Sequence, residues 1–166
     1  MEKRMTEAVV IGGGIAGCTL AYELASRGVG VTVIEQSLIA AESSGRNTGT
    51  LLSGPQRAVV EMLDKSVEVY GELADGPVPF EFARIGHLLI SEDDASLEEA
   101  ATVADRYREA GVGMEKVSGG ELARDHPRLG FNVAGGYFVE RAWTLEPMGA
   151  THAFAHVARL AGAHFR

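Results

Sequence analysis

Three glycines near the N-terminus have the spacing of a turn that holds a dinucleotide pyrophosphate. Gly12, Gly14 and Gly17 follow the apolar run Ala8–Ile11 and open a segment with helical periodicity. In such a strand–turn–helix unit the first glycine allows the tight turn and the second lets the backbone approach the phosphates. The third lets the helix pack closely on the strand. The pattern therefore predicts binding of an adenine dinucleotide.

An acidic residue stands where this kind of unit needs one. Glu35 directly follows the second apolar run, Val31–Ile34, and a carboxylate there accepts hydrogen bonds from ribose hydroxyls. We expect further cofactor contacts from Ile15 and Ala16 at the helix start, whose N–H groups face the phosphates, and from Gln36. A carboxylate repels a 2′-phosphate, which argues against NADP and leaves NAD and FAD both possible. The alternative interpretation is a structural glycine-rich turn.

The elements that position these residues form a strand, a helix and a strand. We expect a buried parallel strand over Ala8–Ile11, a helix from about Gly14 to Arg27 and a second strand over Val31–Ile34. The predicted buried face of the helix consists of small and apolar residues: Cys18, Ala21, Leu24 and Ala25. The segment 41–54 is small, polar and rich in glycine, which predicts a structured, ligand-binding loop with one helical turn.

The rest of the chain alternates helices and strands. Pro55 begins a predicted helix that ends before Gly76 and buries Val59, Leu63, Val67 and Tyr70. Later we expect strands at 85–91, 114–117 and 133–139, helices after Glu92, at 120–125 and at 147–160, and a strand start at Ala163. A strand from Ala163 to Arg166 is too short to seat in a sheet, so we expect a truncated chain.

These elements predict an α/β fold with a Rossmann-like dinucleotide-binding βαβ domain interrupted by the start of an inserted α+β substrate domain. The expected division is 1–79 for the first part of the cofactor domain and 80–142 for the insertion. Residues 143–166 then return to the cofactor domain and leave it incomplete.

Composition excludes several other classes. The chain of 166 residues has a net charge of -8, which argues against a nucleic-acid partner, and we expect no transmembrane segment. A single cysteine, Cys18, rules out an intrachain disulfide framework and favours a cytoplasmic location. His152 and His156 have helical i, i+4 spacing but no third ligand nearby, so we expect no metal site.

A resemblance decides between the possible cofactors. The segment VVIGGGIAGCTLAYELASRGVGVTVIEQ resembles the N-terminus of the D-amino acid oxidase superfamily of FAD-dependent oxidoreductases, which includes glycine and sarcosine oxidases. The loop SSGRNTGTL resembles a segment that contacts flavin and pyrophosphate in that superfamily. The resemblance implies FAD contacts from six loop residues: Ser43, Ser44, Arg46, Asn47, Thr48 and Gly49. For Arg46, a solvated loop arginine is the equal alternative to a phosphate partner.

The resemblance extends in looser form to IGHLLIS, GGELARDHPRL, GGYFVE and TLEP, in the order of the family. Some members attach flavin covalently through a histidine after the acid, and residues 36–54 contain none, which implies noncovalent FAD. The implied function is oxidation of an amine or amino acid by hydride transfer to FAD. Substrate-contacting residues of the family lie beyond this region, so no catalytic residue is assigned.

Two other hypotheses stay open. One is an incomplete or noncatalytic FAD-binding subunit or fragment that needs a partner chain, or self-association, to complete its fold. The other is an NAD-dependent dehydrogenase, which fits the glycines but not the loop after Glu35.

Overall fold

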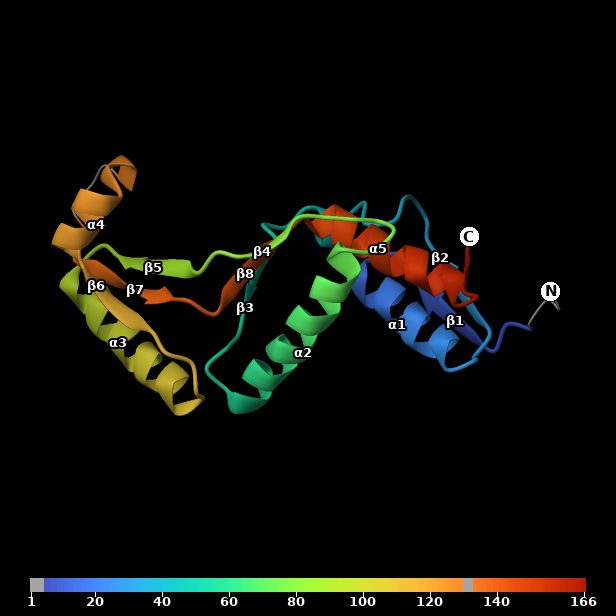
Figure 1. Cartoon of the computed structure of the whole chain (residues 1–166), viewed down its shortest axis with the longest axis horizontal. Coiled ribbons are helices and arrows are strands. Elements are labelled where there is room, and N and C mark those ends of the chain that lie inside the picture. The colour runs from blue at the N-terminus through green and yellow to red at the C-terminus, as the bar shows by residue number, and fades with distance from the viewer. Residues whose placement is uncertain (1–4, 130–132) are drawn as a thin grey trace. The chain divides into compact units, whose positions relative to one another are not determined.

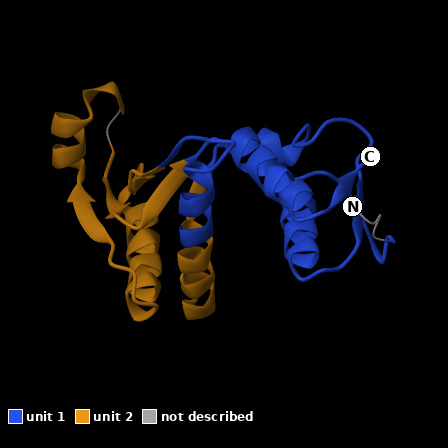
Figure 2. Cartoon of the chain, turned by 45° about the vertical axis from the view of Figure 1, so that its right-hand side comes forward, with its two compact units in different colours: residues 1–49, 68–82, 145–166 blue, residues 50–67, 83–144 orange. Residues whose placement is uncertain are grey.

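The computed structural model describes residues 5–129 and 133–166, and it divides the chain into two compact units (Figure 2). Unit 1 consists of Met1–Gly49, Glu68–Phe82 and Leu145–Arg166, and unit 2 consists of Thr50–Val67 and Ala83–Thr144. The expected domain boundaries after residues 79 and 142 stay a prediction. Residues 50–67, which we placed in the cofactor domain, group here with unit 2.

Unit 1 contains the predicted strand–helix–strand (Figure 1). Strand β1 (Ala8–Ile11) leads into helix α1 (Ile15–Ser26), and strand β2 (Val31–Ile34) pairs with β1 in parallel. Helix α5 (Pro147–Leu160) has the predicted bounds, because Pro147 fits the first helical position and Gly162 follows the end. Glu146 caps this helix by accepting hydrogen bonds from two of its first N–H groups.

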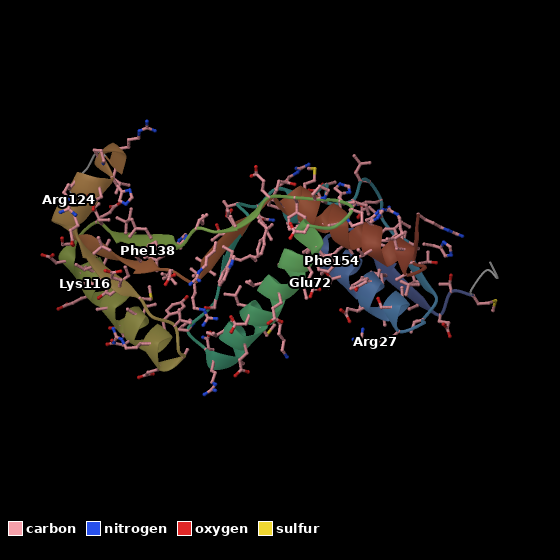
Figure 3. All side chains as sticks on the ribbon, in the orientation of Figure 1. Arg27, Glu72, Lys116, Arg124, Phe138 and Phe154 are labelled. Atoms are coloured by element: carbon pink, nitrogen blue, oxygen red, sulfur yellow. The ribbon has the colours of Figure 1, made fainter. Side chains whose placement is uncertain are left out.

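The core of unit 1 joins both helices to one face of the sheet. Ala21 and Ala25 of α1 and Ala158 of α5 are buried against Val10 and Val33 of the strands. Small side chains on the helices allow this close packing on a parallel sheet. A second cluster places Cys18 beside Phe154, which Figure 3 labels on α5. Leu24, predicted to be buried, is only partly buried.

The end of the chain corrects one prediction. Residues His164–Phe165 form strand β9, which pairs in parallel with β2 and makes the sheet order β1-β2-β9. The Glu35 N–H donates to the Arg166 carbonyl at 2.8 Å, and the Arg166 N–H donates to the Val33 carbonyl at 2.9 Å. Our expectation that this segment is too short to seat in a sheet was therefore wrong, because a formed neighbour supplies its hydrogen bonds.

Unit 2 is built on an antiparallel sheet with the order β5-β7-β6. These strands are His87–Ser91, Gly135–Val139 and Glu115–Ser118, respectively. Helix α3 (Asp94–Glu109) packs on it, with Ala104 and Tyr107 buried against residues of β7. Asp93 accepts a hydrogen bond from the Ser96 N–H and so caps α3.

A second three-stranded sheet has the order β3-β8-β4 and was not predicted. Its strands are Thr50–Leu52, Ala142–Leu145 and Phe82–Arg84. Unlike β1 and β2, these three strands lack a run of β-branched residues followed by a glycine turn or an acid, so no clear signal marks them in the sequence. The segment 41–54, expected to be a loop with one helical turn, contains a 3-10 turn at Ser43–Gly45 and also strand β3, which was not expected.

Two further helices complete the described chain. Helix α2 (Arg57–Ala74) begins two residues after the predicted Pro55, and its buried residues are Val60 and Leu63. Leu63 was predicted to be buried, whereas the predicted Val59 is 38% exposed and its neighbour Val60 is buried instead. Helix α4 (Gly119–Asp125) is capped by Ser118 and is followed by a 3-10 turn at Pro127–Leu129.

Candidate cofactor site

The turn between β1 and α1 has the backbone that the three glycines predict. Gly12 has a φ of 104°, a backbone conformation that residues other than glycine rarely adopt. Its N–H donates to the Ile34 carbonyl at 2.8 Å, which anchors the turn to β2. Gly14 is the N-cap of α1, and the first turn of this helix contains no acidic side chain. The positive end of the helix dipole is therefore available to an anion.

Gly17 lets α1 approach the turn. A Cβ at this position would collide with the Gly12 carbonyl oxygen and would press on Val10 of β1. Only a residue without a side chain fits here, which agrees with the packing role expected from the sequence.

The Glu35 carboxylate accepts a hydrogen bond from the backbone of the glycine turn. Its Oε2 accepts from the Gly13 N–H at 2.6 Å, and its Oε1 accepts from the Ser37 N–H at 2.8 Å. Each carboxylate oxygen can accept a further hydrogen bond, so the group can still receive a ribose hydroxyl. Gly13 was not among the glycines assigned a role from the sequence, but its N–H donates to the Glu35 carboxylate.

These contacts also set the charge of the acid. The hydrogen bond from the Gly13 backbone is the main cause that lowers the pKa of Glu35 below its ordinary value of 4.5, and the bond from Ser37 adds to it. Glu35 is therefore ionised at neutral pH. A negative charge at this point is compatible with ribose hydroxyls and unfavourable for a 2′-phosphate.

The segment after Glu35 folds back over the glycine turn. The Ala40 N–H donates to the Gly13 carbonyl at 3.1 Å, and Ala40 has a φ of 63°, a left-handed conformation that is uncommon for alanine. A Cβ on Gly45 would collide with the Ala40 carbonyl oxygen. Ala40 and Gly45 thus shape the site, although sequence reasoning missed both because nothing local indicates their contacts.

Ser44 joins the predicted cofactor loop to the helix N-terminus. Its Oγ accepts a hydrogen bond from the Ile15 N–H at 3.0 Å, and it lies 2.9 Å from the position that a Cβ on Gly14 would take. The structure therefore brings Ser44 together with the glycine turn, and its contact with a cofactor stays a prediction. The neighbouring Ala16 is exposed on the first turn of α1.

Asn47 and Gly49 hold the other end of the loop. The Asn47 amide donates to the carbonyls of Ser43 and Ser44 at 3.0 and 3.2 Å, and its Oδ1 accepts from the Gly49 N–H at 2.8 Å. Gly49 has a φ of 69°, and its carbonyl accepts from the Leu145 N–H at 2.9 Å. Asn47 therefore acts on the shape of the loop.

The remaining predicted residues of this region are exposed. Arg46 lies 3.8 Å from the Glu42 carboxylate in an ion pair on the surface of the loop. This arrangement leaves the guanidinium accessible, which suits either of its two predicted roles. The side chains of Gln36 and Thr48 also face solvent. Their contact with a cofactor stays a prediction.

Cys18 lies one helical turn from the N-terminus of α1. It is fully buried, and burial raises the pKa of its thiol to about 11. Its Sγ lies 3.5 Å from the Gly13 carbonyl oxygen. Cys18 is thus a packing residue beneath the glycine turn.

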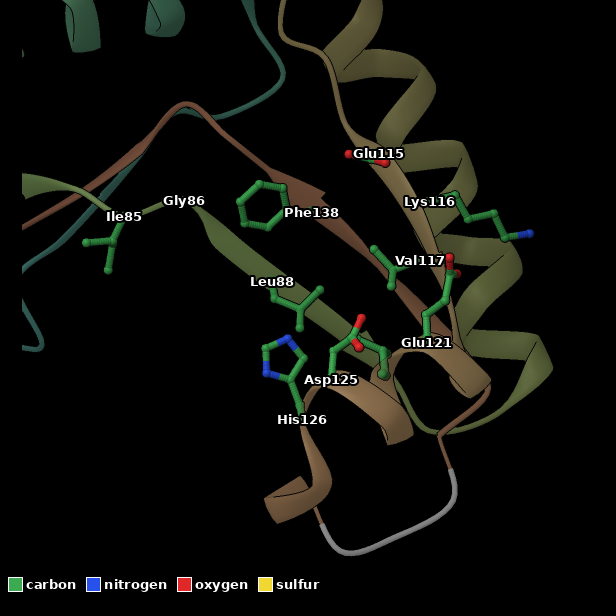
Figure 4. Close-up of a pocket in the computed structure, with 11 residues that line it drawn as sticks. Ile85, Gly86, Leu88, Glu115, Lys116, Val117, Glu121, Asp125, His126 and Phe138 are labelled. Atoms are coloured by element: carbon green, nitrogen blue, oxygen red, sulfur yellow. The ribbon is translucent and has the colours of Figure 1, made fainter.

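Unit 2 contains a hollow of about 470 Å³ on the open face of its antiparallel sheet (Figure 4). Leu88 and Phe138 form its apolar floor, and Glu121 and Asp125 lie at its rim. Both carboxylates already have partners, since Glu121 bonds to Ser118 and Asp125 pairs with Arg124. None of the predicted cofactor residues lines this hollow. Within residues 5–129 and 133–166, no group of three metal-ligating side chains comes together.

The residues around Gly12 fit an adenine dinucleotide. A turn without side chains, a helix N-terminus with no acidic residue in its first turn and an ionised carboxylate at the end of β2 together match pyrophosphate and ribose. Because all of these groups lie in unit 1, the site needs no contact with unit 2. The fold and this site define a dinucleotide-binding α/β protein.

Comparison with known proteins defines the family. The sequence model of the FAD dependent oxidoreductase family matches residues 7–166, so the chain belongs to this family. The resemblance found in the sequence is confirmed, and FAD is the cofactor that the family establishes.

Three solved structures illustrate the likeness. Glycine oxidase from Bacillus cereus has a TM-score of 0.84 at 24% identity, and L-proline dehydrogenase from P. horikoshii has 0.82 at 31%. L-alpha-glycerophosphate oxidase from Mycoplasma pneumoniae, solved with FAD bound, has 0.83 at 21%. The alignments cover 97%, 98% and 100% of this chain but only 46%, 44% and 45% of those proteins. The chain thus spans less than half the length of the proteins that it matches, and its α/β fold corresponds to their N-terminal regions.

One further observation concerns membranes. Among the described residues, no helix is both long and apolar enough to cross a bilayer.

Proposed function

We propose that this chain is the FAD-binding part of an oxidoreductase that oxidises an amine or an amino acid. The observation that carries the proposal is the contact of Glu35 with Gly13, since it places an ionised carboxylate at the turn where a dinucleotide binds. When bound noncovalently, FAD supplies a two-electron acceptor for a hydride from the carbon next to the amine nitrogen, which leaves an imine for water to hydrolyse.

Each part of the site has a proposed task. The open space beside Gly12 leaves room for the pyrophosphate, and the N–H groups at the start of α1 attract its charge. Glu35 accepts hydrogen bonds from the ribose hydroxyls. Ser44 lies against the Ile15 N–H, so the loop that contains it borders the same helix end. None of the described residues is assigned a catalytic task.

The proposed substrate class follows from similarity. Two of the similar proteins, L-proline dehydrogenase and glycine oxidase, are named for amino acid substrates, and L-proline dehydrogenase has 31% identity with this chain. A glycerol phosphate is the competing substrate, because glycerophosphate oxidase has a nearly equal TM-score. The glycine turn and Glu35 are proposed to bind the cofactor and therefore do not distinguish these substrates.

A second candidate function is an FAD-binding part that is not catalytic without further polypeptide, supplied by a partner chain or a second copy. The length of the matched proteins favours it, since more than half of each lies outside the alignment. This hypothesis predicts that the 166 residues bind FAD without turning over any substrate.

Anaerobic titration tests the proposed function. The protein as its natural host makes it is purified, and its visible spectrum is recorded before and after addition of glycine, L-proline or glycerol 3-phosphate. We expect flavin absorbance that bleaches with an amino acid. Bleaching with glycerol 3-phosphate alone would reject the amine assignment. If the flavin of the host protein bleaches with an amino acid whereas flavin bound to the 166-residue chain stays oxidised, the noncatalytic alternative is supported.

A further inference from the structure

The hollow of unit 2 is crossed by a row of three paired side chains. Phe138 of β7 pairs with Leu88 of β5 on one side and with Glu115 of β6 on the other. Residues directly opposite each other in an antiparallel sheet have their side chains on the same face, so all three lie on the open face. Tyr137 and Val139, the neighbours of Phe138 in β7, are buried with residues of α3 on the other face. The row therefore places an aromatic ring between an apolar side chain and a carboxylate (Figure 4).

The same row borders a second hollow. Glu115 and Phe138 line both the hollow of about 470 Å³ described above and another of about 440 Å³. Apolar surface continues from the ring, with Leu88 and Val117 in the larger hollow and Met114 in the smaller one. Cavities of about 300–1,000 Å³ are typical of sites for small organic ligands. Space for the apolar body of such a ligand therefore adjoins the Phe138 ring.

The charged groups around the row are mostly acidic. Four carboxylates line the two hollows: Glu115, Glu121, Asp125 and Glu140. The last two pair with arginines at the surface, whereas the Glu115 carboxylate forms no ion pair among the described residues. The basic residues of the lining are His126 and Lys116, and the Lys116 ammonium points away from the hollow in Figure 4. Glu115 therefore offers a negative charge beside the ring without a cation paired to it.

These groups match an organic ammonium ion. An ammonium group is attracted both to a carboxylate and to the face of an aromatic ring, and an apolar body attached to it covers apolar surface. We propose that the open face of unit 2 binds an organic ammonium ion, with the cation between Glu115 and Phe138 and the apolar body in the larger hollow. The four carboxylates repel anionic ligands from the same place. This site goes beyond the proposed function, because no predicted cofactor residue lines either hollow.

Equilibrium dialysis with phenethylamine tests the proposal. Phenethyl alcohol, which has no charge, and hydrocinnamate, which is an anion, are the comparison ligands. The variants are Glu115→Gln, which removes the charge, and Phe138→Leu, which removes the ring and keeps an apolar side chain. Glu99→Gln, at an exposed position of α3, is the matched control. Dissociation constants are measured for the 166-residue chain, with its fold checked by circular dichroism, and for the protein that the natural host makes from the edited gene.

We expect saturable binding of phenethylamine to both forms of the wild type. Its dissociation constant should rise about tenfold in Glu115→Gln and about threefold in Phe138→Leu, and it should stay unchanged in Glu99→Gln. Both comparison ligands should bind at least about tenfold more weakly than the amine, because neither has a cation for Glu115.

Several results would overturn the proposal. Absence of saturable binding, or equal binding of hydrocinnamate, would reject recognition of an ammonium ion. Binding that Glu115→Gln leaves unchanged would place the ligand elsewhere. Binding to the 166-residue chain but not to the host protein would show that polypeptide, rather than a free amine, occupies the hollow. These outcomes depend on amine binding alone, so they are distinguishable from the flavin bleaching that tests the proposed function.

Discussion

The Glu35 carboxylate accepts a hydrogen bond from the Gly13 N–H at 2.6 Å, and this bond ties the end of β2 to the glycine turn after β1. The same carboxylate accepts from Ser37 through its other oxygen. The acid expected to bind ribose therefore also fixes the backbone beside the pyrophosphate position. Cofactor affinity and the shape of the turn depend on one side chain.

Replacing Glu35 by glutamine tests this double role. A glutamine has a single acceptor oxygen, so one of the two N–H groups of Gly13 and Ser37 loses its partner. We expect the dissociation constant for FAD to rise about tenfold. Calorimetric titration with FAD measures it. Glu42→Gln, which removes only an exposed ion pair in the same loop, is the control and should leave FAD affinity unchanged.

The lowered pKa of Glu35 predicts a pH dependence. Because the folded-state pKa lies below 4.5, ionised Glu35 stabilises the folded protein above this value, and the contribution is lost as pH falls through the folded-state pKa. The free energy of unfolding of wild type and Glu35→Gln should therefore converge on acidification below pH 4.5. Urea unfolding at several pH values measures the difference. A gap that stays constant with pH would contradict the assigned cause.

Gly17 should tolerate no side chain. A Cβ would collide with the Gly12 carbonyl, so we expect Gly17→Ala to lower the free energy of unfolding by about 1–3 kcal/mol and to abolish FAD binding. Gly120→Ala is the control, since a Cβ there meets nothing within 4 Å and alanine favours the helix. Chemical denaturation compares the two. Equal stability of both variants would show that α1 does not pack as described.

Much of the site could be predicted from the sequence because it is local. Gly12, Gly14 and Gly17 are close together in the sequence, in the turn and the first turn of α1, and strand and helix periodicity locates β1, α1 and β2 around them. The contacts of Ala40 with Gly13 and of Gly45 with Ala40 could not be predicted from the sequence, because they depend on how separate segments of the chain pack together. The short strands β3 and β8 were missed for the same reason, because pairing with distant residues determines them. A strand start at Ala163 was expected, but the pairing of β9 with β2 was not.

Loop order should depend on Asn47. Its side chain bonds to Ser43, Ser44 and Gly49, so Asn47→Ala removes three hydrogen bonds at once. We expect the loop to lose its fixed shape and FAD to dissociate faster, with little effect on global stability because the residue is exposed. Stopped-flow release of FAD measures the rate. An unchanged rate would show that the loop does not border the bound cofactor.

Cys18 should be chemically inert in the folded chain. With its thiol buried and its pKa raised to about 11, the thiolate that reacts with alkylating agents is scarce at pH 8. We expect no reaction with iodoacetamide in buffer and complete reaction in concentrated urea. Mass spectrometry detects the adduct. Rapid alkylation of the folded chain would contradict the packing of α1 on the turn.

The most direct measurement of the central claim is a binding titration of the folded 166-residue chain with FAD and, separately, with NADP. Circular dichroism first establishes that the chain is folded. The glycine turn and the ionised Glu35 predict saturable binding of FAD, loss of that binding in Gly17→Ala, and no binding of NADP. A folded chain that binds NADP as tightly as FAD, or that binds neither, would contradict the account.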